Sequence, residues 1–242
     1  MAGSHYIALS GMRARADELD RIAADIANIG TAGYKGERQA RVAAERGAFD
    51  ARLDSAIDTT LAEVRLDMTD GALAPTGRAL DLAIDGEGFF VIETPGGDRY
   101  TRNGHFTLDA GRRLVTEDGH PVKGVDGPIV LADPEGEITV DADGAVWNGV
   151  TKAGQIAIVR FDDPTRLVRE QGTLFAAGGQ EPLATASPVV RAGSLEQSNV
   201  SIAERIAAIT SVSRGFEALQ RAISLVMNDV DGRAIEQLGR RG

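Results

Sequence analysis

The sequence has no cysteine and no long apolar run, and each absence removes a class of function. Without cysteine there are no disulfides, thiolate metal sites or cysteine nucleophiles. No apolar stretch approaches the roughly 18 residues that a membrane-spanning helix needs, so we expect no membrane insertion. Residues 1–20 carry charges where a cleaved signal peptide requires an apolar segment, so we expect no export by that route.

Aromatic residues and histidines are also scarce. Aromatics make up 5% of the chain and Trp147 is the only tryptophan, which argues against a carbohydrate-binding surface. The three histidines, His5, His105 and His120, show no metal-binding spacing, and no G-x-S-x-G elbow or P-loop occurs. The sequence therefore predicts no enzyme class, no cofactor and no metal site.

Two short stretches resemble ligand-binding motifs and fail on closer reading. The run GEGFFV places Val91 where a dinucleotide fingerprint needs its third glycine, and β sequence follows it. The run DADG, residues 141–144, lacks the further carboxylates of a calcium loop, so we expect a hairpin turn there. We also expect hairpin turns at Asn103-Gly104 and Asn148-Gly149.

Negative charge is concentrated in the middle of the chain. Residues 47–200 contain 13 basic and 25 acidic residues, whereas the segments on either side are each close to neutral. Nucleic acid is a poor partner for such a surface, because binding to phosphate relies on clustered lysine and arginine. The nearly neutral ends are better suited to packing against protein.

Both ends of the chain show the periodicity of long helices. Near the N-terminus, apolar residues alternate in steps of three and four, the a/d pattern of a coiled-coil seam, and charged residues such as Asp25 fall outside it. This seam consists of Leu9, Met12, Ala16, Leu19, Ala23 and Ile26.

The C-terminal segment repeats the same alternation for about four heptads. A capping box formed by Ser201 and Glu204 predicts where this helix begins. Its seam consists of Ile202, Ile206, Ile209, Ser213, Phe216, Gln220, Ile223, Met227 and Val230.

Residues 78–192 have a different pattern, with short alternating runs such as FFVI, HFTL and QIAIVRF between Gly, Asn and Asp turns. This pattern is typical of an all-β domain. The expected fold class is therefore α+β, with the terminal helices forming a coiled-coil stalk and a central all-β domain. We expect a discontinuous helical domain over 1–37 and 196–242, an extended connector over 38–77, and the β domain over 78–195.

Six motifs along the chain resemble those of the bacterial flagellar rod and hook family. They are ALSGM (8–12), ANIGTAGYK (27–35), TGRALDLAIDGEGFFVI (76–92), YTRNGHFTLDAGRRLVTEDGHPVKG (100–124), GSLEQSNVS (193–201) and RGFEALQRAISL (214–225). Their order along the chain also matches. Length and the stretch DGPIVL resemble the proximal-rod members most, with distal-rod members as the alternative.

The resemblance implies a structural subunit of the flagellar basal body that transmits torque from motor to hook. It implies export from the cytoplasm through the flagellar type III apparatus without a cleaved signal, and helical assembly into the periplasmic rod. The implied partners are further copies of the chain and other rod subunits, with no nucleic acid and no membrane insertion.

The expected assembly interface combines the two seams with the turn after the first helix. Asn28 and Gly33 are suited to end that helix, and we expect Gly33 to be needed for assembly and not for folding of the β domain. The candidate residues are Leu9, Met12, Leu19, Ile26, Asn28, Thr31, Gly33, Tyr34, Asn199, Ile206, Ile209, Phe216, Ile223 and Val230.

Two other classes of function stay open on the sequence alone. One is a secreted β-domain binding module with an oligomerising stalk, for which glycan binding is the discriminating observation. The other is an acidic hydrolase, which needs a carboxylate pair that a single sequence does not select.

Overall fold

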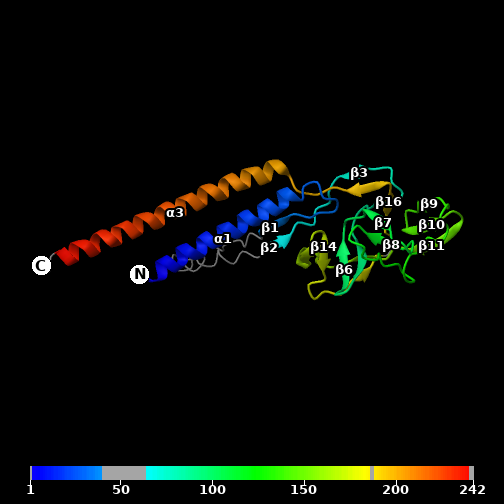
Figure 1. The fold of residues 1–242 in the computed structure, drawn as a ribbon, viewed down its shortest axis with the longest axis horizontal. Helices are drawn as coiled ribbons and strands as arrows, with labels where there is room; N and C mark the ends of the chain where they lie inside the picture. Colours follow the sequence, from blue (N-terminus) through cyan, green and yellow to red (C-terminus); the bar gives the residue numbers. More distant parts are fainter. Residues whose placement is uncertain (1, 40–63, 186–187, 240–242) are drawn as a thin grey trace. The chain divides into compact units, whose positions relative to one another are not determined.

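The computed structural model describes residues 2–39, 64–185 and 188–239. In these ranges the chain has one long helix at each end and β structure between them (Figure 1). Residues 40–63 of the predicted connector lie outside the described residues.

The elements follow one another in a simple order. Within the described residues the α-helices are α1 (Ala2–Ala27) and α3 (Ile202–Gly239), and η2 (Pro164–Arg166) is a 3-10 helix. The strands are β1 (Glu37–Gln39), β2 (Val64–Leu66), β3 (Leu73–Pro75), β4 (Leu82–Ile84), β5 (Phe89–Thr94), β6 (Gly97–Thr101), β7 (Phe106–Leu108), β8 (Leu114–Thr116), β9 (Ile138–Val140), β10 (Ala145–Asn148), β11 (Thr151–Gln155), β12 (Ile158–Arg160), β13 (Val168–Gln171), β14 (Leu174–Ala176), β15 (Leu183–Ala184), β16 (Val190–Ala192) and β17 (Ser194–Glu196).

The chain divides into two compact units. The helical unit contains α1 and α3, and the β unit is made of residues 28–38 and 65–200. The turn that follows α1 therefore belongs to the β unit, together with the segment that precedes α3.

The largest sheet of the β unit has six antiparallel strands in the order β13-β14-β6-β5-β12-β15. Side chains on β5 alternate between two hydrophobic clusters, with Phe90 and Ile92 in one and Phe89 and Val91 in the other. Successive residues of a strand point to opposite faces, so the unbroken apolar run FFVI indicates a strand covered on both sides. The predicted central β domain is confirmed.

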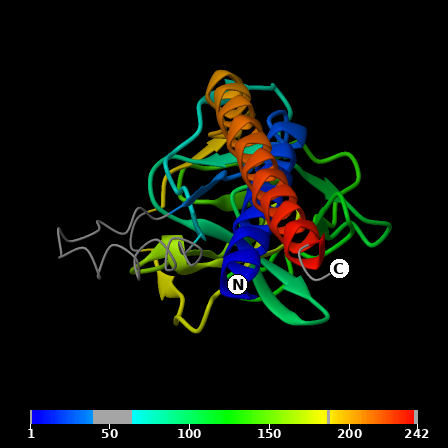
Figure 2. The same ribbon diagram turned by 90° about the vertical axis from the view of Figure 1, so that its left-hand side faces the viewer.

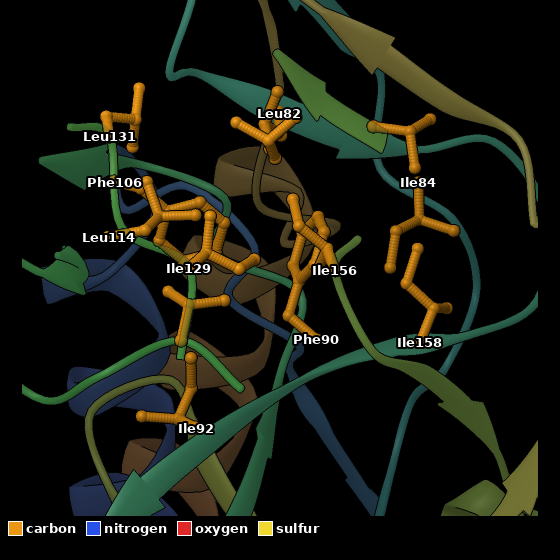
Figure 3. Packing of buried hydrophobic residues seen from close by; sticks show 13 residues of the cluster. Leu82, Ile84, Phe90, Ile92, Phe106, Leu114, Ile129, Leu131, Ile156 and Ile158 are labelled. Carbon is orange, nitrogen blue, oxygen red and sulfur yellow. The ribbon is translucent and has the colours of Figure 1, made fainter. Parts of the chain in front are cut away.

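The larger hydrophobic cluster packs side chains from strands and loops of the β unit (Figure 3). Phe90 and Phe106 meet edge to face, with ring centroids 5.1 Å apart. The cluster consists of Leu82, Ile84, Phe90, Ile92, Phe106, Leu114, Val122, Ile129, Leu131, Val146, Ile156, Ile158 and Val190. It draws on residues 82 to 190, so this core joins strands far apart in the sequence.

The second cluster is rich in aromatic rings. Phe161 contacts both Phe89 and Tyr100 edge to face, with ring centroids 5.9 and 4.8 Å apart. Such contacts between rings add to the free energy that burial of the side chains supplies. Leu66, Val91, Leu167 and Phe175 complete this cluster.

The three predicted turns have different outcomes. Residues 141–144 connect the paired strands β9 and β10, and Gly149, with a φ of 63°, connects β10 to β11. Asn103-Gly104 is not a hairpin turn, because β6 and β7 belong to different sheets. A Cβ atom at Gly104 would lie 1.7 Å from the Leu82 carbonyl oxygen, so this glycine allows two backbone segments to approach closely.

The prediction of a coiled-coil stalk is wrong, since in the described residues α1 and α3 do not pack through their heptad seams. Both views show α1 and α3 side by side, and they cross each other in Figure 2. Asp25 lies near Arg205, and a Cβ atom at Gly215 would lie 3.8 Å from the Arg15 side chain, so the helices run antiparallel. The C-terminal helix begins as predicted, because the Ser201 hydroxyl accepts a hydrogen bond from the Glu204 amide at 3.5 Å.

The reason for the error is that the buried stripe differs from the heptad seam. On residues 11–27 of α1, where burial is described, Ile22 and Asp25 are buried, whereas the seam residues Ala16 and Ala23 are exposed. Asp25 and Arg205 form an ion pair of 3.1 Å where a coiled coil requires an apolar layer.

On α3 the same offset occurs. Val212 is buried, whereas the seam residues Ile202 and Ile206 are 52% and 56% exposed. The apolar seam therefore lies partly on a face that the other helix leaves uncovered.

Candidate functional site: the junction of the terminal motifs

A tight turn ends the first helix and brings the N-terminal motif into the β unit. The Thr31 amide donates to the Asn28 carbonyl at 3.0 Å, and the Thr31 hydroxyl lies 3.2 Å from the Asn28 side-chain oxygen. The Tyr34 amide then donates to the Thr31 carbonyl at 3.3 Å. Both polar residues that the sequence singled out thus stabilise this turn.

Gly33 is the point of closest approach between this turn and the β unit. Its φ of 67° lies in the left-handed region, and its amide donates to the Glu196 carbonyl at 2.7 Å. A Cβ atom here would lie 2.2 Å from the Asn103 amide nitrogen. Gly33 thus lies where a side chain would collide with the backbone of the β unit, so we expect a substitution here to weaken the β unit as well as any assembly contact.

Two residues after Gly33, the chain places a lysine in a buried ion pair. The Lys35 ammonium lies 2.5 Å from a carboxylate oxygen of Glu196, and the two side chains are 1% and 2% exposed. Lys35 also donates to the Thr69 carbonyl at 2.7 Å. The same Glu196 oxygen accepts from the Gly71 amide at 2.9 Å. The pair thus has the additional hydrogen bonds that a buried ion pair needs to be stable.

A second buried cation shares the Glu196 carboxylate. The Arg102 guanidinium lies 3.3 Å from the other carboxylate oxygen of Glu196 and also donates to the Gly86 carbonyl at 2.8 Å. It lies over the Phe89 ring, 5.2 Å from the centroid, and Asp70 approaches it at 3.7 Å from the surface. Glu196 therefore pairs with two buried cations that come from distant parts of the chain, and the exposed Asp70 adds a second carboxylate beside Arg102.

The environment of Lys35 changes its acidity. Burial, which disfavours the charged ammonium, is the largest effect and lowers the pKa of Lys35 below its ordinary value. The Glu196 carboxylate opposes this shift through its charge and hydrogen bond, whereas the Arg102 cation adds to it.

Asn199 joins three segments through its side chain and its amide. The side-chain oxygen accepts from the Gly36 amide at 2.8 Å, and the side-chain nitrogen donates to the Asp67 carbonyl at 2.7 Å. Its own amide donates to the Tyr34 carbonyl at 3.3 Å. The side chain of Asn199 thus bonds to the backbone of two neighbouring segments.

Arg169 contacts the segment from Tyr34 to Glu37, and sequence reasoning missed it. Its guanidinium lies over the Tyr34 ring at 4.3 Å and over the Phe175 ring at 5.4 Å. It also donates to the Lys35 carbonyl and lies 3.4 Å from the Glu37 carboxylate. Arg169 belongs to no quoted motif, so no signal in the sequence marked it.

Lys35, Arg102 and Glu196 were missed as site residues although each lies inside a quoted motif. These motifs, ANIGTAGYK, YTRNGH and LEQSNV, therefore meet at one place in the β unit. We call this place the junction and define it by Gly33, Lys35, Arg102, Glu196 and Asn199.

The remaining predicted residues lie on the helices and the junction does not include them. Met12, Leu19, Ile26, Ile209 and Phe216 are half-buried, and Ile206 is exposed. Leu9, Ile223 and Val230 lie within the helices, and their side chains fall outside the described residues.

The described ranges contain neither a membrane-spanning helix nor a metal cluster. None of the helices in them is long and apolar enough to cross a membrane. Residues 2–39, 64–185 and 188–239 also hold no group of three or more His, Asp or Glu side chains placed to bind a metal ion.

Comparison with known proteins identifies the class to which this arrangement belongs. The family model for the flagellar hook protein FlgE/F/G D1 domain matches residues 83–148, which include Arg102. The model for the flagellar basal body rod FlgEFG protein C-terminal region matches residues 191–231, which include Glu196 and Asn199.

Full-length relatives agree with these matches. The chain is 32% identical to the flagellar basal-body rod protein FlgF of Caulobacter vibrioides over 99% of both chains. It is 34% identical to FlgF of Rhizobium meliloti over 97% of both chains. It is 30% identical to the rod protein FlgG of Bacillus subtilis over 93% of this chain and 95% of that protein.

The chain therefore belongs to the flagellar hook and basal-body rod family, which is a structural family and not a class of enzymes. Within this family the similarity favours the basal-body rod protein FlgF, with FlgG as the alternative.

Replacing Gly33 by alanine tests the close approach at the junction. We expect Gly33→Ala to lower the free energy of unfolding by about 2 kcal/mol or more, because the left-handed backbone and the contact with Asn103 both resist a Cβ atom. Gly30→Ala is the matched control, since nothing lies within 4 Å of a Cβ atom there, and it should change stability by less than about 0.5 kcal/mol. Equal stability of the two variants in denaturant unfolding would contradict the assigned role of Gly33.

Removing the charge of Glu196 tests the ion pairs. We expect Glu196→Gln to lower the free energy of unfolding by about 3 kcal/mol or more, because Lys35 then stays buried without its carboxylate and Arg102 keeps only the exposed Asp70 at 3.7 Å. Arg191→Gln is the control, because its ion pair with Asp85 is about half exposed and should contribute at most about 1 kcal/mol. A Glu196→Gln protein as stable as the control would show that the buried charges do not depend on Glu196.

The pKa of Lys35 gives a test that needs no substitution. The chain has three lysines, so NMR of their side chains can follow each one. We expect the pKa of Lys35 to lie below 10.5 and the pKa of Lys123 to lie above it, because a hydrogen bond to Asp98 favours the charged form of Lys123.

The sign of the effect on stability follows from the same shift. Between the lowered pKa of Lys35 and 10.5 the unfolded chain binds this proton more tightly than the folded protein. Lys35 therefore makes the free energy of unfolding rise with pH across this window. A pKa of Lys35 equal to or above that of Lys123 would contradict the account.

Proposed function

We propose that the protein is a structural subunit of the flagellar basal-body rod, in its proximal part, and that it assembles helically through its terminal helices. Family membership and the full-length similarity to FlgF support the rod assignment. The assembly contacts that we propose involve the seams of α1 and α3 and the turn around Asn28 and Tyr34.

Exposed apolar residues on α3 carry the proposal. Ile202 and Ile206 lie one turn apart on the same helix face and are 52% and 56% exposed. A large apolar side chain gains about 1.5 to 3 kcal/mol when it is fully buried, so this face favours contact with another protein surface. Their heptad spacing with the half-buried Ile209 suits a helix of a neighbouring subunit as that surface.

The proposed partners are further copies of this chain, other rod subunits, including the distal rod protein, and the flagellar type III export apparatus. Export without a cleaved signal agrees with a chain that has no cysteine and therefore no disulfide to form before assembly. In the assembled rod the subunit would transmit torque from motor to hook.

Electron microscopy of basal bodies tests this function. In a strain that lacks the gene we expect a truncated rod and no hook, and the length of the remaining rod would separate a proximal from a distal position. Intact rods with hooks would contradict the rod assignment.

A point variant tests the helix face itself. We expect Ile206→Glu to stop rod assembly and swimming while the purified protein keeps its stability within about 1 kcal/mol, because this side chain is exposed and glutamate favours helices. Val150→Glu also replaces an apolar side chain by glutamate, at a hairpin turn of the β unit where the side chain is 97% exposed, and should leave swimming unchanged. Normal swimming of Ile206→Glu cells would remove this face from the proposed interface.

A further inference from the structure

The last strands of the β unit complete its first strands. Strand β16 pairs with β4, with Val190 opposite Ile84, and β17 pairs with β3, with Glu196 opposite Leu73. Each of these two sheets has two strands, so among the described residues β4 and β3 have no other ladder partner. The backbone of β4 thus gains its strand partner only when residues 190–192 are present.

The same late segment contributes to the hydrophobic core. Leu82, Ile84 and Val190 belong to one cluster and are at most 4% exposed. Without Val190 and its strand, the β4 side chains would lose part of their cover, and burial of such side chains is the main favourable contribution to folding.

Charge balance makes the early segments depend on the late one as well. Glu196 follows Lys35 by 161 residues and Arg102 by 94 residues. In a chain that ends before Glu196, Lys35 lacks its ion-pair partner and Arg102 keeps only the exposed Asp70, so burial of the two cations is strongly unfavourable.

The N-terminal turn has its partners in the same late segment. Gly33 donates to the Glu196 carbonyl, and the Tyr34 carbonyl and Gly36 amide are both bonded by Asn199. The turn therefore docks on a surface that residues 196–199 themselves form.

We propose that the β unit folds as one cooperative unit that closes only after residues up to Val200 are present. During the proposed export, a part of the chain that ends before residue 200 then does not fold by itself. This inference rests on the proposed export. The long sequence separation between the residues that meet at the junction would then delay folding of the β unit. Contacts between residues that are distant in sequence also form slowly, because the chain between them must close into a loop first.

Native-state hydrogen exchange on the full-length protein tests this proposal. The amides of Gly33, Thr76 and Gln197 report on the contact between early and late segments of the β unit. Each donates a hydrogen bond between these segments, to the carbonyls of Glu196, Gly193 and Ala72 respectively. The amides of Leu114 and Val122 report on the core. We expect both groups to exchange through the same opening, with equal free energies and equal denaturant dependence.

A different pattern would overturn the proposal. If Leu114 and Val122 stay protected while Gly33, Thr76 and Gln197 exchange through a smaller opening, the core is stable without its closing segments. Folding would then not wait for residue 200.

A pair of full-length variants adds a second readout. Glu196→Gln should lower protection at Leu114 by the same factor as at Gln197, about 100-fold or more, because both depend on one closure. Arg191→Gln, the control on β16, should lower protection by at most about fivefold. Loss of protection confined to Gln197 in the Glu196→Gln protein would contradict the proposal.

This outcome is independent of the rod assignment. If the core exchanges separately from its closing segments, the folding proposal is refuted. The rod assignment, tested by truncated rods in the deletion strain, would be unaffected. Intact rods in that strain would refute the proposed function and leave the exchange result standing as a property of the β unit.

Discussion

The Glu196 carboxylate, shared by the buried cations Lys35 and Arg102, is the constraint on which the rest of the β unit depends. A buried cation is tolerated only when an opposite charge and hydrogen bonds surround it. Here the shared carboxylate comes from the last strand, one cation from the turn after α1, and the other from the residue that follows β6. The requirement to keep charges paired therefore fixes the two ends of the β unit against its central sheet.

The junction lies close in sequence to the end of one terminal helix and the start of the other. Helix α1 ends at Ala27, eight residues before Lys35, and α3 begins at Ile202, six residues after Glu196. Between each helix and the junction the chain is held by backbone hydrogen bonds of the β unit, at Gly33 on one side and Asn199 on the other. The helices are thus attached to the β unit through segments that belong to its fold.

Local sequence patterns predicted the helices and strands, but they did not predict which distant residues pair. Helical periodicity and the Ser201 cap depend on neighbouring residues, so α1, α3 and the β runs were readable from sequence. The heptad seam gave the wrong helix contact, because Asp25, outside the seam, pairs with Arg205, and Ile206, inside it, is exposed. The junction motifs were recognised, but no local pattern pairs Lys35 with a residue 161 positions away.

A double-mutant cycle on Lys35 and Glu196, measured by denaturant unfolding of the full-length protein, tests the central claim most directly. The four proteins are the wild type, Lys35→Met, Glu196→Gln and the double variant. If the buried pair links the two ends, the double variant loses less stability than the sum of the single variants, with a coupling of about 2 kcal/mol or more. Additive effects within about 0.5 kcal/mol would show that the two residues act independently and would contradict this account.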